Sequence, residues 1–392
     1  MTGSRYAVFH GCGPRLRRNV AGFIVPAASS VWYGVRSTHP WSAQKRSSVR
    51  IVSWYVRAAM TAHRTDRWQR LSFTSEALAD NPLGDPHDRT LWVWSPSDTS
   101  RRYPSVYVLQ GMTGIVDGWF NVRAWTESYP DAIERLAPDA VVVLVDAFTS
   151  VGGSQFLDSP AVGRYHAYLC DEIVPFVDRA FPTLAEARHR GIQGKSSGGY
   201  GAMVTPMLRP DLFGGLATHA GDAAFELCYQ PEFAPAARAL REKYDGSFDA
   251  FWRDFRSGRP VLDNREDPLL VNTYAMAAAY SANDDGTIEL PFDLATGELV
   301  PEVFERWLAR DPVRMARSPS HAEALRGLRG IWVDSGKSDE YYLDLSATSF
   351  RNTLAEIGVP DDVIHFELFD GKHSGTAWRY PLALTWLVER LA

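Results

Sequence analysis

The chain has 392 residues, of which 45% are apolar, and this is enough to bury the core of one large domain. Its formal net charge of −6 is spread unevenly, because residues 1–60 hold nine Lys or Arg and no acidic residue, whereas the rest carries 32 basic and 47 acidic side chains. A body this acidic argues against nucleic acid as a partner.

The cysteines and the apolar runs exclude further classes of protein. Cys12, Cys170 and Cys228 are too few for a disulfide framework, so no oxidising compartment is required. No Cys/His spacing is typical of a metal site, and no apolar run reaches the length of a membrane span. We therefore expect no cofactor, no metal, no membrane span and a cytoplasmic location.

The acid-free segment 1–60 allows three interpretations. Arg17-Arg18 precede a short apolar stretch and Ala27-Ala28-Ser29, as in a targeting peptide, but Pro26 cuts this stretch short. A basic tail that binds a membrane or a partner is less favoured, because the charges are scattered. We expect a disordered or dispensable extension, with Met60 as an alternative start of the working chain.

Residues 61–392 are predicted to form one domain of alternating strands and helices. Residues 70–74 and 90–95 are typical of leading antiparallel strands. The continuous apolar run 141–145 is typical of a strand in a parallel sheet covered on both faces, and an amphipathic helix is expected over 168–181. This alternation predicts an α/β protein with a doubly wound, mostly parallel sheet.

Residues 194–198, Gly-Lys-Ser-Ser-Gly, match the G-x-S-x-G pattern of a nucleophile elbow. In that turn the serine lies between a strand and a helix, and the glycines keep side chains away from a crowded backbone. The segment also ends like a phosphate-binding P-loop, but that motif needs a glycine where the chain has His189. The pattern therefore favours a serine hydrolase of the α/β-hydrolase fold, with Ser196 as nucleophile.

The histidine of such an enzyme follows the serine and the acid in chain order. His373 lies in a glycine-flanked loop directly after 364–368, where apolar and more polar residues alternate as in a strand. His365 lies inside this strand and His321 in a helical stretch, so neither is as well placed. We expect His373 to be the general base.

The acid is expected between the serine and the histidine. The apolar run 330–333 predicts a buried strand, and Asp334 and Asp339 both lie near its carboxyl end, where open α/β sheets build their sites. Asp339, in the loop proper, is better placed to orient the imidazole. Asp334 and Asp222, which follows an earlier strand, remain the alternatives.

Each of these residue types suits one step of ester hydrolysis. A serine hydroxyl is a poor nucleophile, so His373 takes its proton and later protonates the leaving alcohol, while Asp339 holds the imidazole tautomer. The oxyanion needs two N–H donors. We assign them to the backbone amides of Ser197, the residue after the nucleophile, and Met112, in the loop after the strand 106–109.

A long segment separates the strand at 216–218 from the strand of the acid. It exceeds an ordinary crossover, so we expect a helical lid insertion over about 222–328, with helices at 235–244, 248–256 and 301–310. Its many Arg, Phe, Trp and Tyr residues suit a bulky or aromatic acyl ester, or simply pack the lid's own core. Four residues outside the lid are candidates for binding the substrate, with core packing as the competing interpretation for the aromatic ones: Trp119, Tyr200, Ser154 and Gln155.

Several segments together resemble the Putative esterase family of α/β hydrolases, which includes esterase D or S-formylglutathione hydrolase, enterochelin esterases, feruloyl esterases and mycolyltransferases. The resemblance spans about residues 67–392. Besides the elbow it rests on the segments 152–155, 159–165, 171–178, 336–340 and 371–375. It implies the same triad of Ser196, Asp339 and His373.

Two positions depart from this family's pattern. The strand before the oxyanion loop often ends His-Gly in these enzymes, whereas here it ends Gln110-Gly111, and Ser197 stands where the elbow often has methionine. Backbone donors survive both changes. The resemblance therefore implies the reaction class but does not carry over a substrate.

These observations lead to one leading hypothesis and two alternatives. The leading one is a serine carboxylic-ester hydrolase that acts on a small-molecule ester through an acyl-enzyme. An acyltransferase of the mycolyltransferase type would use the same triad but pass the acyl group to an alcohol. A non-catalytic binding protein on a hydrolase fold is disfavoured by the intact serine, acid and histidine.

Overall fold

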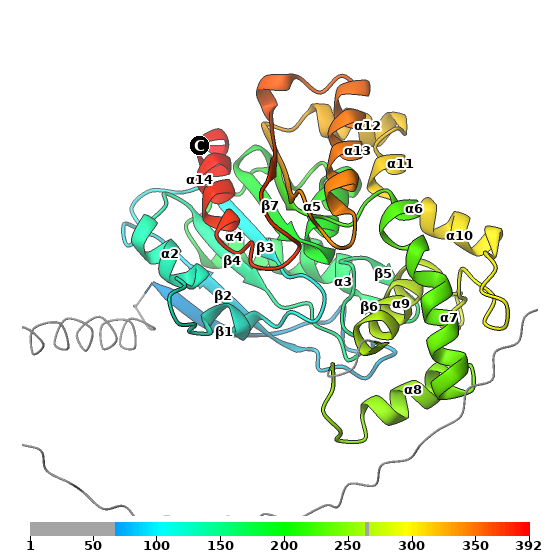
Figure 1. Cartoon of the computed structure of the whole chain (residues 1–392). Helices are drawn as coiled ribbons and strands as arrows, with labels where there is room; N and C mark the ends of the chain where they lie inside the picture. The colour runs from blue at the N-terminus through cyan, green and yellow to red at the C-terminus, as the bar shows by residue number, and fades with distance from the viewer. Residues whose placement is uncertain (1–66, 263–265) are drawn as a thin grey trace, which may run out of the picture. The chain divides into compact units, whose positions relative to one another are not determined.

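The computed structural model describes residues 67–262 and 266–392, and the extension predicted for residues 1–60 lies outside them. An eight-stranded sheet runs through the described chain (Figure 1). Its strands are β1 (Trp68–Thr74), β2 (Asp88–Trp94), β3 (Ser105–Leu109), β4 (Val141–Val145), β7 (Arg190–Lys195), β8 (Gly215–His219), β9 (Gly330–Gly336) and β10 (Ile364–Phe369). A separate two-stranded ribbon pairs β5 (Asp158–Ser159) with β6 (Gly163–Arg164).

The order of the strands determines where a site can form. Across the sheet the order is β1-β2-β4-β3-β7-β8-β9-β10. β2 is antiparallel to both β1 and β4, and every other neighbouring pair is parallel. The chain winds from β3 to β4 in one direction and later continues from β7 on the other side of β3. The carboxyl ends of β3 and β7 therefore border the crevice at which open α/β sheets bind ligands.

The central strands are buried on both faces, as the apolar run at 141–145 predicted. Along β3, Val106 and Val108 belong to one apolar cluster, and Tyr107 and Leu109 to another. Because successive side chains of a strand point to opposite faces, two cores form, one on each side of the sheet. This is the pattern of a sheet covered by helices on both faces.

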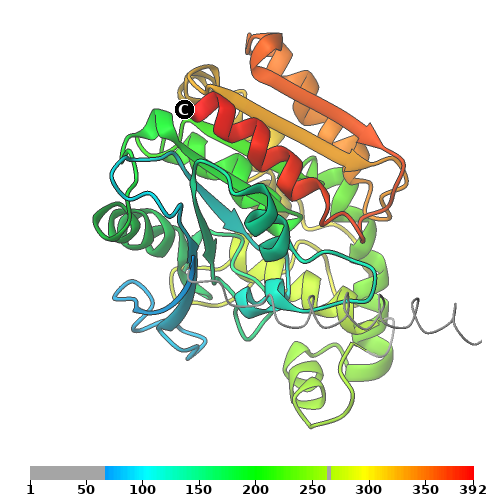
Figure 2. The same cartoon turned by 90° about the vertical axis from the view of Figure 1, so that its left-hand side faces the viewer.

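The helices divide between the two faces. On one face lie α2 (Tyr129–Leu136) and α14 (Arg379–Leu391), which crosses β7, β8 and β9 (Figure 2). The other carries α5 (Ser197–Leu208), α13 (Leu343–Glu356) and a continuous run made of α3 (Tyr165–Ala167), the π-helical η3 (Tyr168–Ile173) and α4 (Val174–Ala180). The predicted helix at 168–181 lies in this run. Short 3-10 turns are η2 (Val116–Phe120), η4 (Ala187–His189) and η5 (Asp361–Val363).

Seven helices occupy the described part of the segment between β8 and β9. They are α6 (Phe225–Cys228), α7 (Gln230–Tyr244), α8 (Phe248–Phe255), α9 (Glu266–Tyr280), α10 (Pro301–Leu308), α11 (Pro312–Met315) and α12 (Pro319–Arg326). α11 and α12 pack on α5, whereas α7, α8, α9 and α10 gather to one side of the sheet (Figure 1).

Three of these helices match predicted ones, and α9 was not predicted. α7 begins five residues earlier than expected, because Pro231 starts the helix and Pro235 lies inside it. α8 and α10 begin at the predicted residues. α9 is buried along most of its length, so no alternation of polar and apolar faces marks it in the sequence.

Candidate active site

The elbow is formed where β7 ends and α5 begins. Ser196 has φ 56° and ψ −126°, a conformation that ordinary side chains rarely adopt. The turn allows no side chain at Gly198, where a Cβ would lie 2.6 Å from the carbonyl oxygens of both Leu109 and Gln110. The Ser196 amide donates to the carbonyl oxygens of His219 and Ala220, each 3.1 Å away. The backbone around Ser196 is thus held by the strands on both sides of β7.

His373 and Asp339 form a close pair in the loops beyond β10 and β9. The Nδ1 atom of His373 lies 2.8 Å from Oδ2 of Asp339. The other carboxylate oxygen of Asp339 accepts the backbone N–H of Tyr341, and the amide of His373 donates to Glu340. The ring of Tyr341 packs edge-on against the imidazole. Because the carboxylate can only accept, Nδ1 carries the proton and Nε2 is left as the basic nitrogen.

Ser196 and His373 line one cavity of about 390 Å³. The hydrogen bonds of the described residues do not join the two side chains, and Ser196 Oγ instead lies 3.4 Å from Oδ1 of Asp222. The loop after β3 forms one wall, because Gly111 and Met112 line the same cavity. The remaining wall comes largely from the segment after β8, through Asp222, Cys228, Tyr229, Glu232, Leu262, Pro268, Leu269, Val271 and Asn272.

The two amides assigned to the oxyanion lie next to the nucleophile. Ser197 is the first residue of α5, and Gly111 is packed so closely that a Cβ there would lie 3.5 Å from the Cβ of Ser196. Within the described chain, neither the Met112 nor the Ser197 amide has an acceptor. Both donors are therefore available to a bound group.

Asp222 is buried in a cluster beside the elbow. Its Oδ2 accepts the hydroxyl of Tyr229 at 2.7 Å and the amide of Gln155 at 3.2 Å, and the Ser197 hydroxyl lies 3.4 Å away. Gln155 also donates to the hydroxyl of Tyr280. Burial raises the pKa of Asp222, although Tyr229, His373 and Gln155 favour the ionised form.

Two more ionisable groups line the cavity. Burial lowers the pKa of Lys195, against the attraction of nearby carboxylates. Burial raises the pKa of Glu232 to about 7, with the hydrogen bond from Asn272 opposing the shift and the charge of Asp222 adding to it. The cavity therefore combines apolar walls with several polar groups, as small-molecule sites do.

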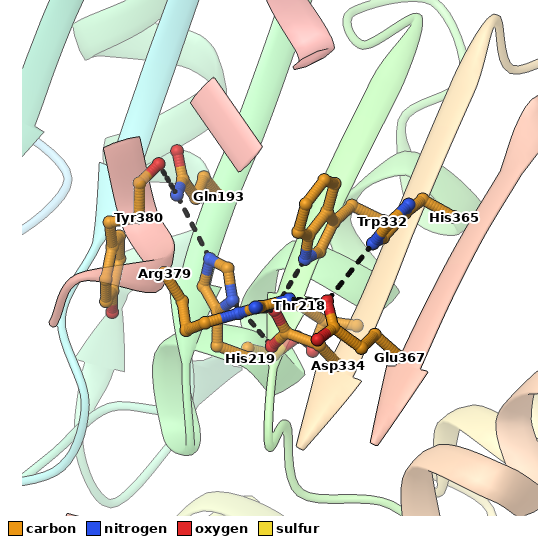
Figure 3. Close-up of polar contacts among 10 residues, drawn as sticks. Gln193, Thr218, His219, Trp332, Asp334, His365, Glu367, Arg379 and Tyr380 are labelled. Atoms are coloured by element: carbon orange, nitrogen blue, oxygen red, sulfur yellow. Dashed lines mark hydrogen bonds and ion pairs between the residues drawn. The ribbon is translucent and has the colours of Figure 1, made fainter. Parts of the chain in front are cut away.

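Asp334 is itself buried, and it lies in a different network on the α14 face of the sheet (Figure 3). Its Oδ1 lies 2.7 Å from Nδ1 of His219, and its Oδ2 accepts from the Trp332 indole and the Arg379 guanidinium at 2.7 and 2.8 Å. Burial alone would raise the pKa of Asp334, but His219, Trp332 and Arg379 more than offset it and lower this pKa. Arg379 also binds Glu367.

The tautomer of His219 follows from its second neighbour. The amide nitrogen of Gln193 lies 2.8 Å from the carbonyl oxygen of Tyr380 and 3.1 Å from Nε2 of His219. Since this nitrogen must donate to the carbonyl, its second hydrogen faces Nε2, and the ring proton of His219 belongs on Nδ1, toward Asp334. This His–Asp pair supports the strand end that holds the Ser196 amide.

The structure brings some of the predicted site residues together and leaves others apart. Ser196, Asp339, His373, Met112 and Ser197 meet around the cavity. Asp334 and Asp222, the alternative acids, lie in the two buried clusters. His365 stacks on Trp332, and His321 contacts the carbonyl oxygen of Met315.

The four candidate substrate-binding residues do not line the main cavity. Trp119 packs against Tyr129 and Tyr380, and Tyr200 is fully buried, with its hydroxyl bound to the carbonyl oxygen of Arg310. Ser154 and Gln155 are buried beside a much smaller cavity behind the oxyanion loop. Gln155 therefore contacts the site through Asp222 and Tyr229, which both line the main cavity.

Sequence reasoning did not single out Glu232, Asn272 or Tyr341, which line the cavity. Glu232 and Asn272 lie on different helices, 40 positions apart, and no motif joins them. Tyr341 directly follows the predicted acid loop, so its position next to Asp339 was the one available signal.

Comparison with known proteins decides the family. The family described as Putative esterase matches residues 86–385, which is most of the chain. The chain belongs to the Putative esterase family. It is an esterase built on the α/β-hydrolase fold, and the family, the fold and the esterase class predicted from the sequence are confirmed.

Three solved structures share the fold of this esterase at low sequence identity. A ferulic acid esterase has a TM-score of 0.52 and 17% identity, covering 83% of this chain and 98% of its own. An S-formylglutathione hydrolase from Agrobacterium tumefaciens has a TM-score of 0.51 and 16% identity, covering 83% and 95%. MPT51 (FbpC1) of Mycobacterium tuberculosis has a TM-score of 0.51 and 15% identity, covering 83% and 99%. At this identity they show the fold alone. Among curated proteins, none matches the esterase.

The described residues of the esterase hold neither a membrane-spanning helix nor a cluster of metal ligands. No described helix combines the length and apolar content that a membrane span needs. Within 67–262 and 266–392, no group of three or more His, Cys, Asp or Glu side chains is arranged to hold a metal ion.

Proposed function

We propose that this esterase hydrolyses carboxylic esters through an acyl-enzyme on Ser196, with His373 and Asp339 completing the triad. His373 Nε2 takes the hydroxyl proton as Ser196 Oγ attacks the ester carbonyl carbon. When the tetrahedral intermediate collapses, His373 returns the proton to the leaving alcohol. Water, activated by the same nitrogen, then attacks the acyl-enzyme, and the acid is released as Ser196 recovers its proton.

The charge that develops on the carbonyl oxygen would be met by the amides of Met112 and Ser197. Both lie beside Ser196 and neither has an acceptor within the described chain. Backbone donors held in place by the fold need little reorganisation during the reaction. Losing one such donor typically costs about 3–4 kcal/mol of barrier.

The step from Ser196 to His373 requires a change of side-chain rotamer. Ser196 Oγ now lies near Asp222, while His373 Nε2 has no hydrogen-bond partner among the described residues. Catalytic hydrogen bonds are often long in unliganded enzymes and tighten when the substrate binds. We therefore propose that the substrate turns Ser196 Oγ from Asp222 toward His373.

The segment of about 222–328 is proposed as the lid that completes the substrate site. It supplies a large part of the cavity wall, through residues between Asp222 and Asn272. A wall built from an insertion, rather than from the sheet, can differ between enzymes that share the triad. The substrate class would then be set by this wall.

One observation carries the proposal: the contact between His373 and Asp339 at the cavity that also holds the strained Ser196. Labelling by a fluorophosphonate and turnover of p-nitrophenyl esters test it. We expect Ser196→Ala to lose all labelling and about 10⁶-fold in kcat, because no other group supplies the nucleophile.

The matched control is Ser338→Ala, which changes an exposed serine next to Asp339. It should label and turn over like the unaltered protein. Labelling or turnover that survives in a folded Ser196→Ala variant would contradict the proposal.

A further inference from the structure

The lid side of the cavity holds a carboxylate and an amide that the proposed chemistry does not use. Glu232 lies in the first turn of α7 and Asn272 in the middle of α9. These two helices pack side by side (Figure 1). Both side chains line the cavity that contains Ser196 and His373.

The hydrogen bond between Glu232 and Asn272 leaves one acceptor oxygen free on each side chain. Asn272 Nδ2 donates to Glu232 Oε2 at 2.8 Å, and while Glu232 is ionised this amide cannot be reversed, because a carboxylate only accepts hydrogen bonds. Within the described chain, neither Oε1 of Glu232 nor Oδ1 of Asn272 receives a hydrogen bond. The pair therefore offers two free acceptor oxygens, beside the second hydrogen of the Asn272 amide, at the wall of the cavity.

The charge of Glu232 is also uncompensated. No Lys, Arg or His nitrogen of the described chain lies within 4.0 Å of its carboxylate, and Lys195, which lines the same cavity, forms no such pair. Leu269 and Val271, which are close to Asn272 in the sequence, also line the cavity, and both are apolar. A largely desolvated carboxylate without a cation is costly, and a cation that arrives with the substrate would remove this cost.

We propose that Glu232 and Asn272 form a specificity site for an ester that carries an ammonium group or another multi-donor cation. This inference rests on the proposed function, since it assigns a substrate class to the same cavity. An ammonium supplies the several N–H donors that the two free oxygens can accept, together with the charge that Glu232 lacks. The burial that raises the pKa of Glu232 to about 7 agrees with this unpaired state.

The test compares p-nitrophenyl esters in matched pairs, one member ending in an ammonium and the other in a methyl group. A second set places the same two groups on the alcohol part, so that either orientation in the cavity is sampled. The measured quantity is the ratio of kcat/KM for the ammonium ester to that for the methyl ester. We expect the unaltered protein to favour the ammonium member of at least one pair.

Two variants on different helices then test the residues. Glu232→Gln keeps the shape of the side chain and removes its charge. We expect it to lower the ratio by about tenfold or more, because the ammonium group of the substrate would then lack its carboxylate partner. Asn272→Ala should lower it less. The control is Glu242→Gln, an exposed position on the same helix, which should leave the ratio unchanged.

The pH dependence of this ratio separates Glu232 from its neighbours. The other titratable groups that line the cavity are Lys195, Asp222, Cys228, Tyr229, Tyr341 and His373. His373 acts on both esters alike, so its titration cancels in the ratio. Glu232 becomes neutral as the pH falls through about 7, so we expect the ratio to fall from pH 8 to pH 6 in the unaltered protein and to stay level in Glu232→Gln. A slope that persists in Glu232→Gln would assign it to another group.

Labelling of Ser196 by a fluorophosphonate, measured in parallel, distinguishes two failures. A ratio near one in every pair, with normal labelling, would overturn the specificity site and leave the proposed function intact. A ratio that Glu232→Gln does not change would also overturn it. Absent labelling in the folded, unaltered protein would overturn the proposed function itself.

Discussion

At the scale of single residues, the site depends on which aspartate serves which histidine. Asp339 and Asp334 are five positions apart, yet Asp339 meets His373 at the cavity, in the loops beyond the strand ends, whereas Asp334 meets His219 on the α14 face of the sheet. The loop position of Asp339 allowed its choice from the sequence. The pairing of Asp334 with His219 and Arg379 could not be foreseen, because it joins residues from separate elements whose packing no local pattern encodes.

The role proposed for Asp339 predicts a large effect on turnover. Asp339→Asn should lower kcat by roughly 10⁴-fold, since an amide no longer holds the tautomer with Nε2 unprotonated. Steady-state hydrolysis of a p-nitrophenyl ester measures it. Asp370→Asn, in the exposed loop just before His373, is the control and should change kcat little. An Asp339→Asn enzyme with near-normal kcat would exclude Asp339 as the orienting acid.

Asp222 predicts a dependence of stability on pH. Its pKa is raised in the folded protein, so the folded state holds a proton that the unfolded state has already released, and this group's contribution to stability falls as the pH rises above its unfolded value. In Asp222→Asn the side chain cannot ionise, so this loss of stability at higher pH does not occur. The Tm of Asp222→Asn minus that of the unaltered protein should therefore increase from about pH 4 to pH 7. Asp284→Asn, an exposed change, should show no such trend, and a flat or falling difference for Asp222→Asn would refute the argument.

At the scale of elements, the network around Asp334 links the last three strands of the sheet, β8, β9 and β10, to the last helix, α14. Arg379 of α14 binds Asp334 of β9 and Glu367 of β10, and Asp334 binds His219 of β8 (Figure 3). The strands and helices themselves were largely predictable. β4 is a continuous apolar run, and the elbow motif predicts a strand before it, β7, and a helix after it, α5. α9 was not, since a helix that is buried on nearly all sides has no amphipathic pattern.

This network predicts a marked loss of stability when its cation is removed. Arg379→Leu leaves buried Asp334 without its guanidinium partner, so the free energy of unfolding should fall by about 3–5 kcal/mol. Urea denaturation measures this quantity. Arg351→Leu removes an ion pair whose partner, Asp361, is exposed, and should cost about 1 kcal/mol or less. Equal effects of the two changes would show that the buried network adds no special stability.

At the scale of the whole molecule, everything proposed for catalysis lies in residues 67–392. The sheet, both apolar clusters and the cavity are formed there. The overall fold could be predicted because its motifs occur in a fixed chain order. The identity of the residues that line the cavity could not, since Trp119 and Tyr200 pack in the core while Glu232 and Asn272 come from helices that only tertiary packing brings together.

The predicted dispensability of residues 1–60 can be tested on the whole protein. A chain that begins at Met60 should keep its kcat/KM for p-nitrophenyl esters and its Tm, because it retains every described strand and helix. Turnover and thermal unfolding of the two chains are compared under the same conditions. A chain from Met60 that loses turnover while remaining folded would assign a functional role to the segment.

The central claim is that the acyl group passes through Ser196, and the most direct test is to find it there. The unaltered protein and His373→Ala are mixed with a p-nitrophenyl ester, quenched in acid and digested, and the peptide containing Ser196 is weighed by mass spectrometry. We expect this peptide to gain the mass of the acyl group, with the modification on Ser196 Oγ, early in turnover by the unaltered protein. An unmodified Ser196 peptide, recorded while the ester is being hydrolysed, would contradict it.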